Sequence, residues 1–177
     1  VLLGMGGSSL APEVLSKTFG SADGFPELLV LDSTHPDQVK AIEASIDISK
    51  TLFIIASKSG GTVETHAFYK YFYALTGNNG AQFIAITDPD SDLEAIAKNQ
   101  GFRDCFLNPA DIGGRYSALS YFGLVPAALI GLDLDRVRTS IDDMLRASGE
   151  NMTSESNTGV MLGAIMGALA KEGRDKV

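Results

Sequence analysis

The sequence predicts an α/β protein built on a five-stranded parallel sheet. Short apolar runs alternate with longer amphipathic stretches, which is typical of strands that are buried on both faces and joined by crossover helices. The length of 177 residues, with 45% apolar and 20% charged residues, matches one ordinary globular domain. We therefore expect a single domain that spans residues 1–177.

The predicted elements follow one another in a regular order. Apolar runs predict strands at Val1–Gly4, Leu28–Asp32, Leu52–Ser57, Gln82–Thr87 and Cys105–Leu107. The amphipathic stretches between them predict helices at Leu10–Phe19, Pro36–Ser45, Thr62–Thr76 and Asp92–Asn99. After Asn108 the strand signals stop, and helices are predicted at Tyr121–Gly131, Asp135–Ser148 and Thr158–Lys171. Each crossover is long enough for a right-handed return, so parallel pairing is expected.

Charge and cysteine content exclude several classes of partner. The 14 basic and 22 acidic residues give a net charge of −8, so the overall field repels nucleic acid and anionic membrane surfaces. No run of about 18 apolar residues predicts a membrane span, and no leader precedes the first motif. The single cysteine, Cys105, allows no internal disulfide and favours a cytoplasmic location. Because Val1 already lies inside an apolar run, we expect a domain excised from a longer protein.

A glycine-rich turn follows the first predicted strand and opens a helix. The segment Gly4-Met5-Gly6-Gly7-Ser8-Ser9 departs from the dinucleotide fingerprint, which needs glycine where Ser9 stands. Serines there suit a terminal phosphate better. Taken alone, this segment fits a plain tight turn as well as it fits a ligand site.

A second turn, Ser57-Lys58-Ser59-Gly60-Gly61-Thr62, repeats this arrangement after the third strand. The hydroxyls of Ser57, Ser59 and Thr62, with backbone N–H groups between Lys58 and Thr62, can surround a monoester phosphate at a helix N-terminus. The residue order is not that of a Walker P-loop, which disfavours nucleotide hydrolysis. The alternative is an ordinary Ser/Thr/Gly turn with an N-cap. Open α/β sheets bind ligands at the carboxyl ends of their strands, so we expect both turns on one rim.

Three segments together resemble a known family. Ser57–Thr65 is similar to the phosphosugar loop of SIS (sugar isomerase) domains, and Gly4–Ser8 resembles a turn of glucose-6-phosphate isomerases. Gly113-Gly114-Arg115-Tyr116-Ser117 resembles the motif that separates these isomerases from sugar-phosphate sensors, and Leu31–Pro36 looks closest to the isomerase half of fused transaldolase/isomerases. The resemblance covers essentially the whole chain. It implies the SIS fold, a three-layer α/β/α sandwich, with a second SIS domain absent from this chain.

The resemblance also implies roles for particular residues. The residues that it implies in phosphate and sugar binding are Gly7, Ser8, Ser57, Lys58 (through its backbone N–H), Ser59 and Thr62. It places Arg115 near the reacting oxygens, where a fixed guanidinium stabilises the anionic cis-enediolate of aldose–ketose isomerisation. The alternative for Arg115 is a loop arginine that ties the sheet to the helical tail. The implied substrates are glucose 6-phosphate and fructose 6-phosphate, with no metal or organic cofactor, and the implied assembly is a homodimer.

The family's glutamate base, ring-opening histidine and lysine have no matching motif in this chain. We therefore expect residues 1–177 to bind the phosphosugar without isomerising it. Glu64 is expected to complement the helix dipole and to orient Lys58 or another group rather than to transfer the proton. For His35 and His66 we predict capping or packing roles. The aromatic run Phe68–Tyr73 predicts core or interface packing.

Two other functions fit parts of the same pattern. A non-enzymatic sugar-phosphate sensor, such as the SIS module of a transcription regulator, would share the Ser57–Thr65 loop but has no use for Arg115. A sugar-phosphate isomerase of different specificity is the other candidate, because the sequence does not show the contacts that select an epimer.

Overall fold

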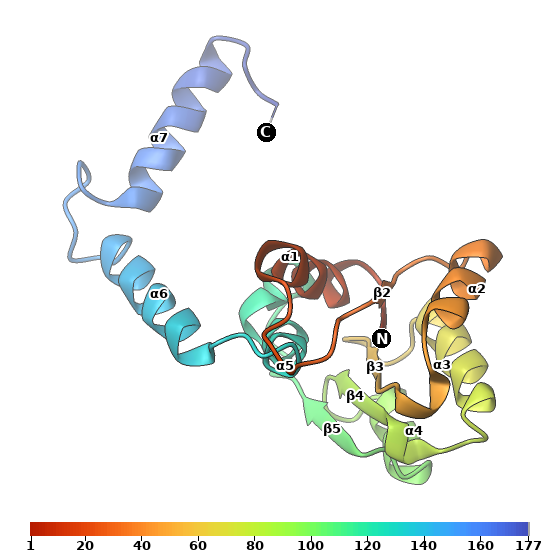
Figure 1. Cartoon of the computed structure of the whole chain (residues 1–177). Coiled ribbons are helices and arrows are strands. Elements are labelled where there is room, and N and C mark those ends of the chain that lie inside the picture. Colours follow the sequence, from red (N-terminus) through yellow and green to blue (C-terminus); the bar gives the residue numbers. More distant parts are fainter. Residues whose placement is uncertain (177) are drawn as a thin grey trace. The chain divides into compact units, whose positions relative to one another are not determined.

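A computed structural model describes residues 1–176 of the chain (Figure 1). Its five strands form one parallel sheet in the order β2-β1-β3-β4-β5. The strands are β1 (Leu2–Gly4), β2 (Val30–Leu31), β3 (Phe53–Ala56), β4 (Phe83–Thr87) and β5 (Asp104–Leu107). The predicted α/β class with a five-stranded parallel sheet is confirmed.

The helices lie where the amphipathic pattern predicts them, with boundaries that shift by at most two residues. They are α1 (Leu10–Phe19), α2 (Pro36–Ser45), α3 (Val63–Leu75), α4 (Asp92–Asn99), α5 (Tyr121–Leu129), α6 (Leu134–Ala147) and α7 (Thr158–Lys171). Side-chain caps explain several of the starts. At α4, for example, the Ser91 hydroxyl accepts a hydrogen bond from the Glu94 N–H at 3.2 Å.

Sequence analysis did not predict four short 3₁₀ segments. They are η1 (Gly6–Ser8), η2 (Ile48–Lys50), η3 (Gly80–Gln82) and η4 (Gly114–Leu119). Each is too short to carry a hydrophobic period, so the pattern that locates the long helices does not reveal them.

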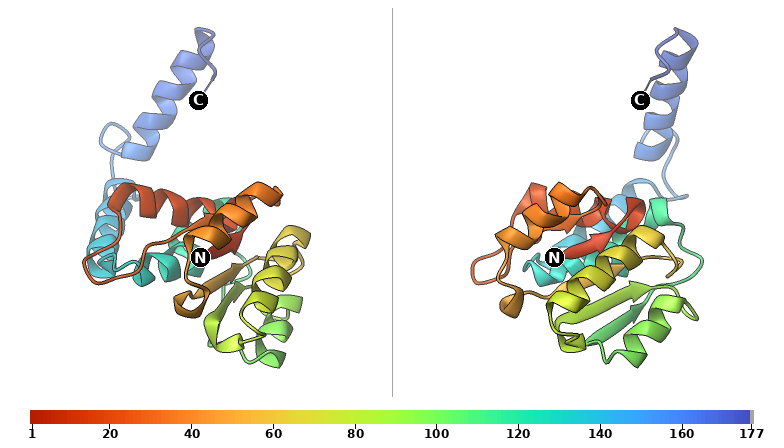
Figure 2. Two further views of the ribbon diagram at one scale, coloured as in Figure 1. Left: turned by 45° about the vertical axis from the view of Figure 1, so that its right-hand side comes forward. Right: turned by 90° about the vertical axis from the view of Figure 1, so that its right-hand side faces the viewer.

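Successive residues of each strand point to opposite faces of the sheet, and helices cover both faces. Leu3 and Phe53 belong to a core shared with α3 and α4, while Leu2 and Ile54 pack on the other side with Phe122 of α5. In Figure 1, α1 and α5 lie to the left of the strands, with α2, α3 and α4 to the right, and Figure 2 shows these layers from two further directions. The three-layer sandwich is confirmed.

The aromatic run of α3 serves the core, as predicted. Phe68, Tyr69 and Phe72 are buried against the sheet, and the ring of Phe72 lies 5.0 Å from that of Phe53. Tyr71 faces outward, and its hydroxyl donates a hydrogen bond to the Glu43 carboxylate at 2.6 Å. The run therefore anchors α3 on the sheet.

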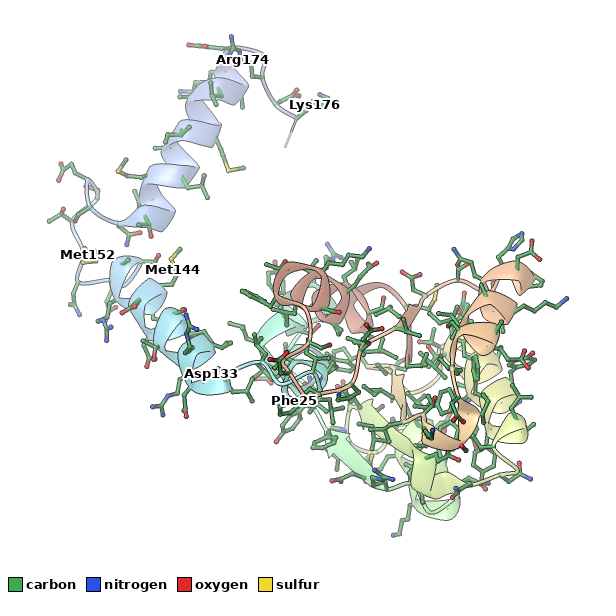
Figure 3. The ribbon with its side chains drawn as sticks, in the orientation of Figure 1. Phe25, Asp133, Met144, Met152, Arg174 and Lys176 are labelled. Atoms are coloured by element: carbon green, nitrogen blue, oxygen red, sulfur yellow. The ribbon has the colours of Figure 1, made fainter. Side chains whose placement is uncertain are left out.

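The chain divides into two compact units, of which the first is Val1–Leu132 and the second begins at Asp133. In the second unit, the Asn157 side chain caps α7 by accepting hydrogen bonds from the N–H groups of Gly159 and Val160. Figure 3 labels Met144 on α6 and Met152 in the loop before α7. Every side chain of α7 is exposed although most are apolar. None of the described helices is long and apolar enough to cross a membrane. The expectation of one domain over residues 1–177 stays a prediction.

Candidate functional site

The two predicted loops leave adjacent strands at the point where the strand order reverses. β1 pairs with both β2 and β3, and Gly4 at its end lies in register with Ala56 at the end of β3. From β1 the chain moves toward β2, whereas from β3 it moves toward β4. Loops that diverge in this way leave a crevice at the carboxyl edge of the sheet, where doubly wound proteins bind ligands.

The turn after β1 contacts the segment that carries Arg115. A Cβ atom added to Gly7 would lie 2.3 Å from the carbonyl oxygen of Gly114, so only glycine permits the observed approach of the two backbones. The Ser117 hydroxyl lies 2.7 Å from the Gly114 carbonyl oxygen and 3.2 Å from that of Gly7. The fold thus brings together two segments that are more than 100 residues apart in the chain.

The turn after β3 presents hydroxyls and free N–H groups. The hydroxyls of Ser57 and Thr62 lie 2.9 Å apart, with Ser57 buried and Ser59 exposed. Gly60 donates its N–H to the Ser57 carbonyl, and Gly61 donates to the Ser59 hydroxyl. The N–H groups of Gly60 and Gly61 were expected among the donors to an anion, but both already donate hydrogen bonds within the turn. In the described part of the chain, the N–H groups of Lys58, Ser59 and Thr62 donate no hydrogen bond, which leaves them for an anion.

His66 and His35 both contact backbone groups. The Nε2 atom of His66 lies 2.6 Å from the Gly60 carbonyl oxygen, so the ring holds the tip of the β3 turn. The Nδ1 atom of His35 accepts a hydrogen bond from the Asp37 N–H at 3.3 Å and caps α2. These contacts agree with the capping and packing roles predicted for the two histidines.

Replacing Gly60 with alanine is expected to disrupt the β3 turn, whereas Gly61→Ala is expected to be tolerated. Gly60 has a φ of +68°, and an added Cβ would lie 2.6 Å from the Cβ of Ser91. At Gly61 nothing lies within 4 Å of such an atom. We expect Gly60→Ala to lower the free energy of unfolding by about 1–3 kcal/mol in urea titrations. A loss of similar size in Gly61→Ala would contradict this account.

The Lys58 side chain contacts two neighbouring loops and makes no hydrogen bond or ion pair with Glu64 in the described structure. Its ammonium pairs with the Asp88 carboxylate and donates to the Ala110 carbonyl at 2.9 Å. Of the two alternatives expected for Glu64, the orientation of Lys58 is wrong, because the Asp88 carboxylate after β4 takes that place. The orientation of another group stays a prediction. Glu64 remains a half-buried residue in the first turn of α3, where it complements the helix dipole.

Arg115 lies exposed in η4, on the segment that touches Gly7. Within the first compact unit, Val1–Leu132, its guanidinium makes no hydrogen bond or ion pair. The alternative role, a structural tie between the sheet and the helical tail, has no such contact to support it within Val1–Leu132, and both roles stay predictions. A guanidinium on this rim can pair with an anionic oxygen of a ligand.

Three polar residues of this rim were given no role from the sequence. Asp88 follows β4, Asn108 directly follows β5 and is fully buried, and Ser117, part of the Gly113–Ser117 motif, joins η1 to η4. The amide of Asn108 donates to the Pro109 carbonyl at 3.1 Å, while its Oδ1 has no partner in the described structure. The position of Asp88 and Asn108 at strand ends was the available signal, since the ends of parallel strands share one edge.

A separate open cavity of about 250 Å³ lies beside the edge strand β5. Its lining includes Cys105, Lys98 and Glu94 and none of the residues of the two loops. Burial raises the pKa of the Cys105 thiol, and the carboxylates of Glu94 and Asp104 raise this pKa further. The described residues contain no group of three metal-ligating side chains.

A doubly wound sheet with two hydroxyl- and glycine-rich turns at its switch point defines an α/β protein with a ligand-binding edge. The family model for phosphoglucose isomerase matches residues 1–167. The chain therefore belongs to the phosphoglucose isomerase family.

Curated relatives agree with this assignment. The chain is 38% identical over 141 residues to a glucose-6-phosphate isomerase of Thermus thermophilus, covering 76% of this chain and 33% of the relative. It is 36% identical to glucose-6-phosphate isomerase of Campylobacter jejuni, covering 74% and 33%. Thus the chain spans about a third of the length of these curated relatives.

Among solved structures, a hypothetical protein from Thermus thermophilus has a TM-score of 0.84 at 31% identity, covering 94% of this chain and 40% of that one. A glucose-6-phosphate isomerase from Chlamydia trachomatis has a TM-score of 0.73 at 23% identity, covering 96% of this chain and 33% of that one. At that identity the second likeness supports the fold alone.

Proposed function

We propose that this chain is the phosphosugar-binding part of a glucose-6-phosphate isomerase. In this proposal it binds glucose 6-phosphate and fructose 6-phosphate at the carboxyl edge of its sheet. The observation that carries the proposal is the meeting of three segments there: the β1 turn, the β3 turn and η4 with Arg115. The family assignment supports the same substrates, since the curated relatives bear that name.

The phosphate is held by the β3 turn. The hydroxyls of Ser57, Ser59 and Thr62 and the free N–H of Lys58 supply neutral donors at the N-terminus of α3. The Lys58 ammonium is already paired with Asp88. A molecule with a net charge of −8 can bind a dianion in this way because the donors act locally.

The sugar extends from the phosphate toward η1 and η4. Gly7 and Ser8 line it, and Arg115 lies at the oxygens of C1 and C2. Isomerisation removes a proton beside a carbonyl and passes through a cis-enediolate, whose negative charge the guanidinium stabilises. The base and the group that opens the ring come from outside residues 1–177, and the intact protein is a cytoplasmic homodimer. The free guanidinium of Arg115 favours this enzyme over a sugar-phosphate sensor.

Replacing Ser57 with alanine is expected to weaken the binding of fructose 6-phosphate about 10- to 150-fold, the range of one hydrogen bond to a charged group. The buried hydroxyl lies 2.9 Å from that of Thr62, so its loss also removes the partner that orients Thr62. Calorimetric titration of the chain measures the change. The matched control is Ser45→Ala at the end of α2, where the hydroxyl bonds the Ile42 carbonyl. Equal affinities in the two variants, or no binding by the native chain, would contradict the proposal.

A further inference from the structure

One ammonium group joins three loops at the carboxyl edge of the sheet. Lys58 follows β3, Asp88 follows β4 and Ala110 follows β5. The Lys58 ammonium pairs with the Asp88 carboxylate and donates to the Ala110 carbonyl at 2.9 Å. The residues after Ala110 lead directly to Gly113–Ser117, which contain Arg115. The Lys58 side chain therefore links the β3 turn, which is the phosphate turn of the proposed function, to Gly113–Ser117, the Arg115 segment.

The loop after β4 holds both the backbone and the side chain of Lys58. The Asp88 N–H donates to the Lys58 carbonyl at 3.1 Å, while the Thr87 hydroxyl lies 3.4 Å from the same oxygen. The Thr87 hydroxyl is itself 2.8 Å from the Ser91 hydroxyl that caps α4. These contacts anchor the main chain of Lys58 on a rigid strand end.

The Asp88 carboxylate has one cationic partner among the described residues. Its side chain is only 16% exposed, against 31% for Lys58, and its Oδ1 is buried without a hydrogen-bond partner. A carboxylate so withdrawn from water depends on its ion pair. The pair therefore fixes the direction of the lysine side chain, which in isolation is a flexible stem with a strongly hydrated charge.

We propose that Asp88 is a positioning residue, which turns the Lys58 ammonium toward Ala110 and thereby sets the distance between the phosphate turn and the Arg115 segment. This inference rests on the proposed function. With Asp88 in place, a phosphate group binds the neutral donors of the β3 turn. A hexose phosphate whose length matches the distance from this turn to Arg115 also contacts the guanidinium. Without Asp88, Lys58 becomes a mobile charge beside the phosphate site and attracts any phosphate, while the Arg115 segment loses its tie.

The test compares Asp88→Asn with Asp90→Asn, two variants that remove the same charge from the same loop. Asp90 is exposed, its φ is +60°, which asparagine tolerates, and its carboxylate takes no hydrogen bond in the described structure. The affinities of each variant for fructose 6-phosphate and for inorganic phosphate are measured by calorimetry. We expect Asp88→Asn to lower the ratio of the affinity for fructose 6-phosphate to the affinity for inorganic phosphate at least tenfold. Inorganic phosphate itself should bind as tightly as before or more tightly. Asp90→Asn should keep the native ratio, and Asp88→Glu should restore part of it.

A ligand-free readout separates this inference from the proposed function. In ¹⁵N spectra of Asp88→Asn we expect the amides of Gly113–Ser117 to shift, with those in the first halves of β3 and β4, Phe53–Ile54 and Phe83–Ala85, unchanged. If Asp88→Asn does not fold, Lys58→Met removes the same tie from its other end and should shift the same amides. Unshifted amides at Gly113–Ser117, or a native affinity ratio in Asp88→Asn, would overturn the inference. Failure of the native chain to bind fructose 6-phosphate would count against the proposed function, and the amide shifts would still decide the role of Asp88.

Discussion

Arg115→Met is expected to weaken the binding of an enediolate mimic about 10- to 150-fold while leaving inorganic phosphate binding unchanged. A suitable mimic is a five-carbon aldonate 5-phosphate, because its planar carboxylate stands for the enediolate oxygens. The magnitude corresponds to about 1.5–3 kcal/mol for a hydrogen bond between two charged groups. Calorimetric titration with the mimic and with inorganic phosphate measures both affinities.

The physical reason is that Arg115 has no other partner within the first compact unit. Its guanidinium is exposed and makes no ion pair or hydrogen bond with residues of Val1–Leu132. A free guanidinium offers two parallel donors to a planar anion, which lysine cannot reproduce. Arg115→Lys should therefore recover only part of the affinity.

The matched control is Arg138→Met, which removes an exposed arginine from α6. This variant should bind both ligands as the native chain does. If Arg115→Met and Arg138→Met weaken mimic binding equally, the effect is one of net charge. Equal loss of mimic and phosphate binding in Arg115→Met would place the guanidinium at the phosphate instead.

Gly7→Ala is expected to separate η1 from η4 and to lower the free energy of unfolding by about 1–3 kcal/mol, as for other overpacked sites. The added Cβ would lie 2.3 Å from the Gly114 carbonyl oxygen and 2.7 Å from its carbonyl carbon. Both are backbone atoms, so no side chain can rotate away. Because η4 carries Arg115, mimic binding should fall together with stability. Urea unfolding and the mimic titration measure the two effects.

Gly114→Ala provides the control on the other side of the same contact. Nothing lies within 4 Å of a Cβ added to Gly114, so this variant should keep native stability and affinity. A Gly7→Ala variant as stable as Gly114→Ala would show that the two backbones do not approach as closely as described.

The sequence predicted local features well because local chemistry decides them. Pro36 and Ser91 mark the starts of α2 and α4, and both helices begin where these residues predict. The alternation of short apolar runs with longer amphipathic stretches also predicted the parallel strands. Short strands such as β2, with two residues, were predicted too long because apolar flanking residues extend the run beyond the hydrogen-bonded ladder.

The candidate site was predictable only in part, because its assembly depends on distant contacts. The hydroxyls of the β3 turn are visible in the sequence, but the pairing of Lys58 with Asp88 spans 30 positions. The contact of Gly7 with Gly114 likewise arises from packing. Spacing along the chain carries no signal for either contact, and this is why Glu64 was wrongly expected to orient Lys58.

The most direct test of the central claim is a crystal structure of the chain with fructose 6-phosphate. We expect the phosphate within hydrogen-bond distance of the Ser57, Ser59 and Thr62 hydroxyls, with the C1 and C2 oxygens turned toward Arg115. A phosphate held by the Lys58 ammonium, or a sugar bound in the cavity beside β5, would contradict it.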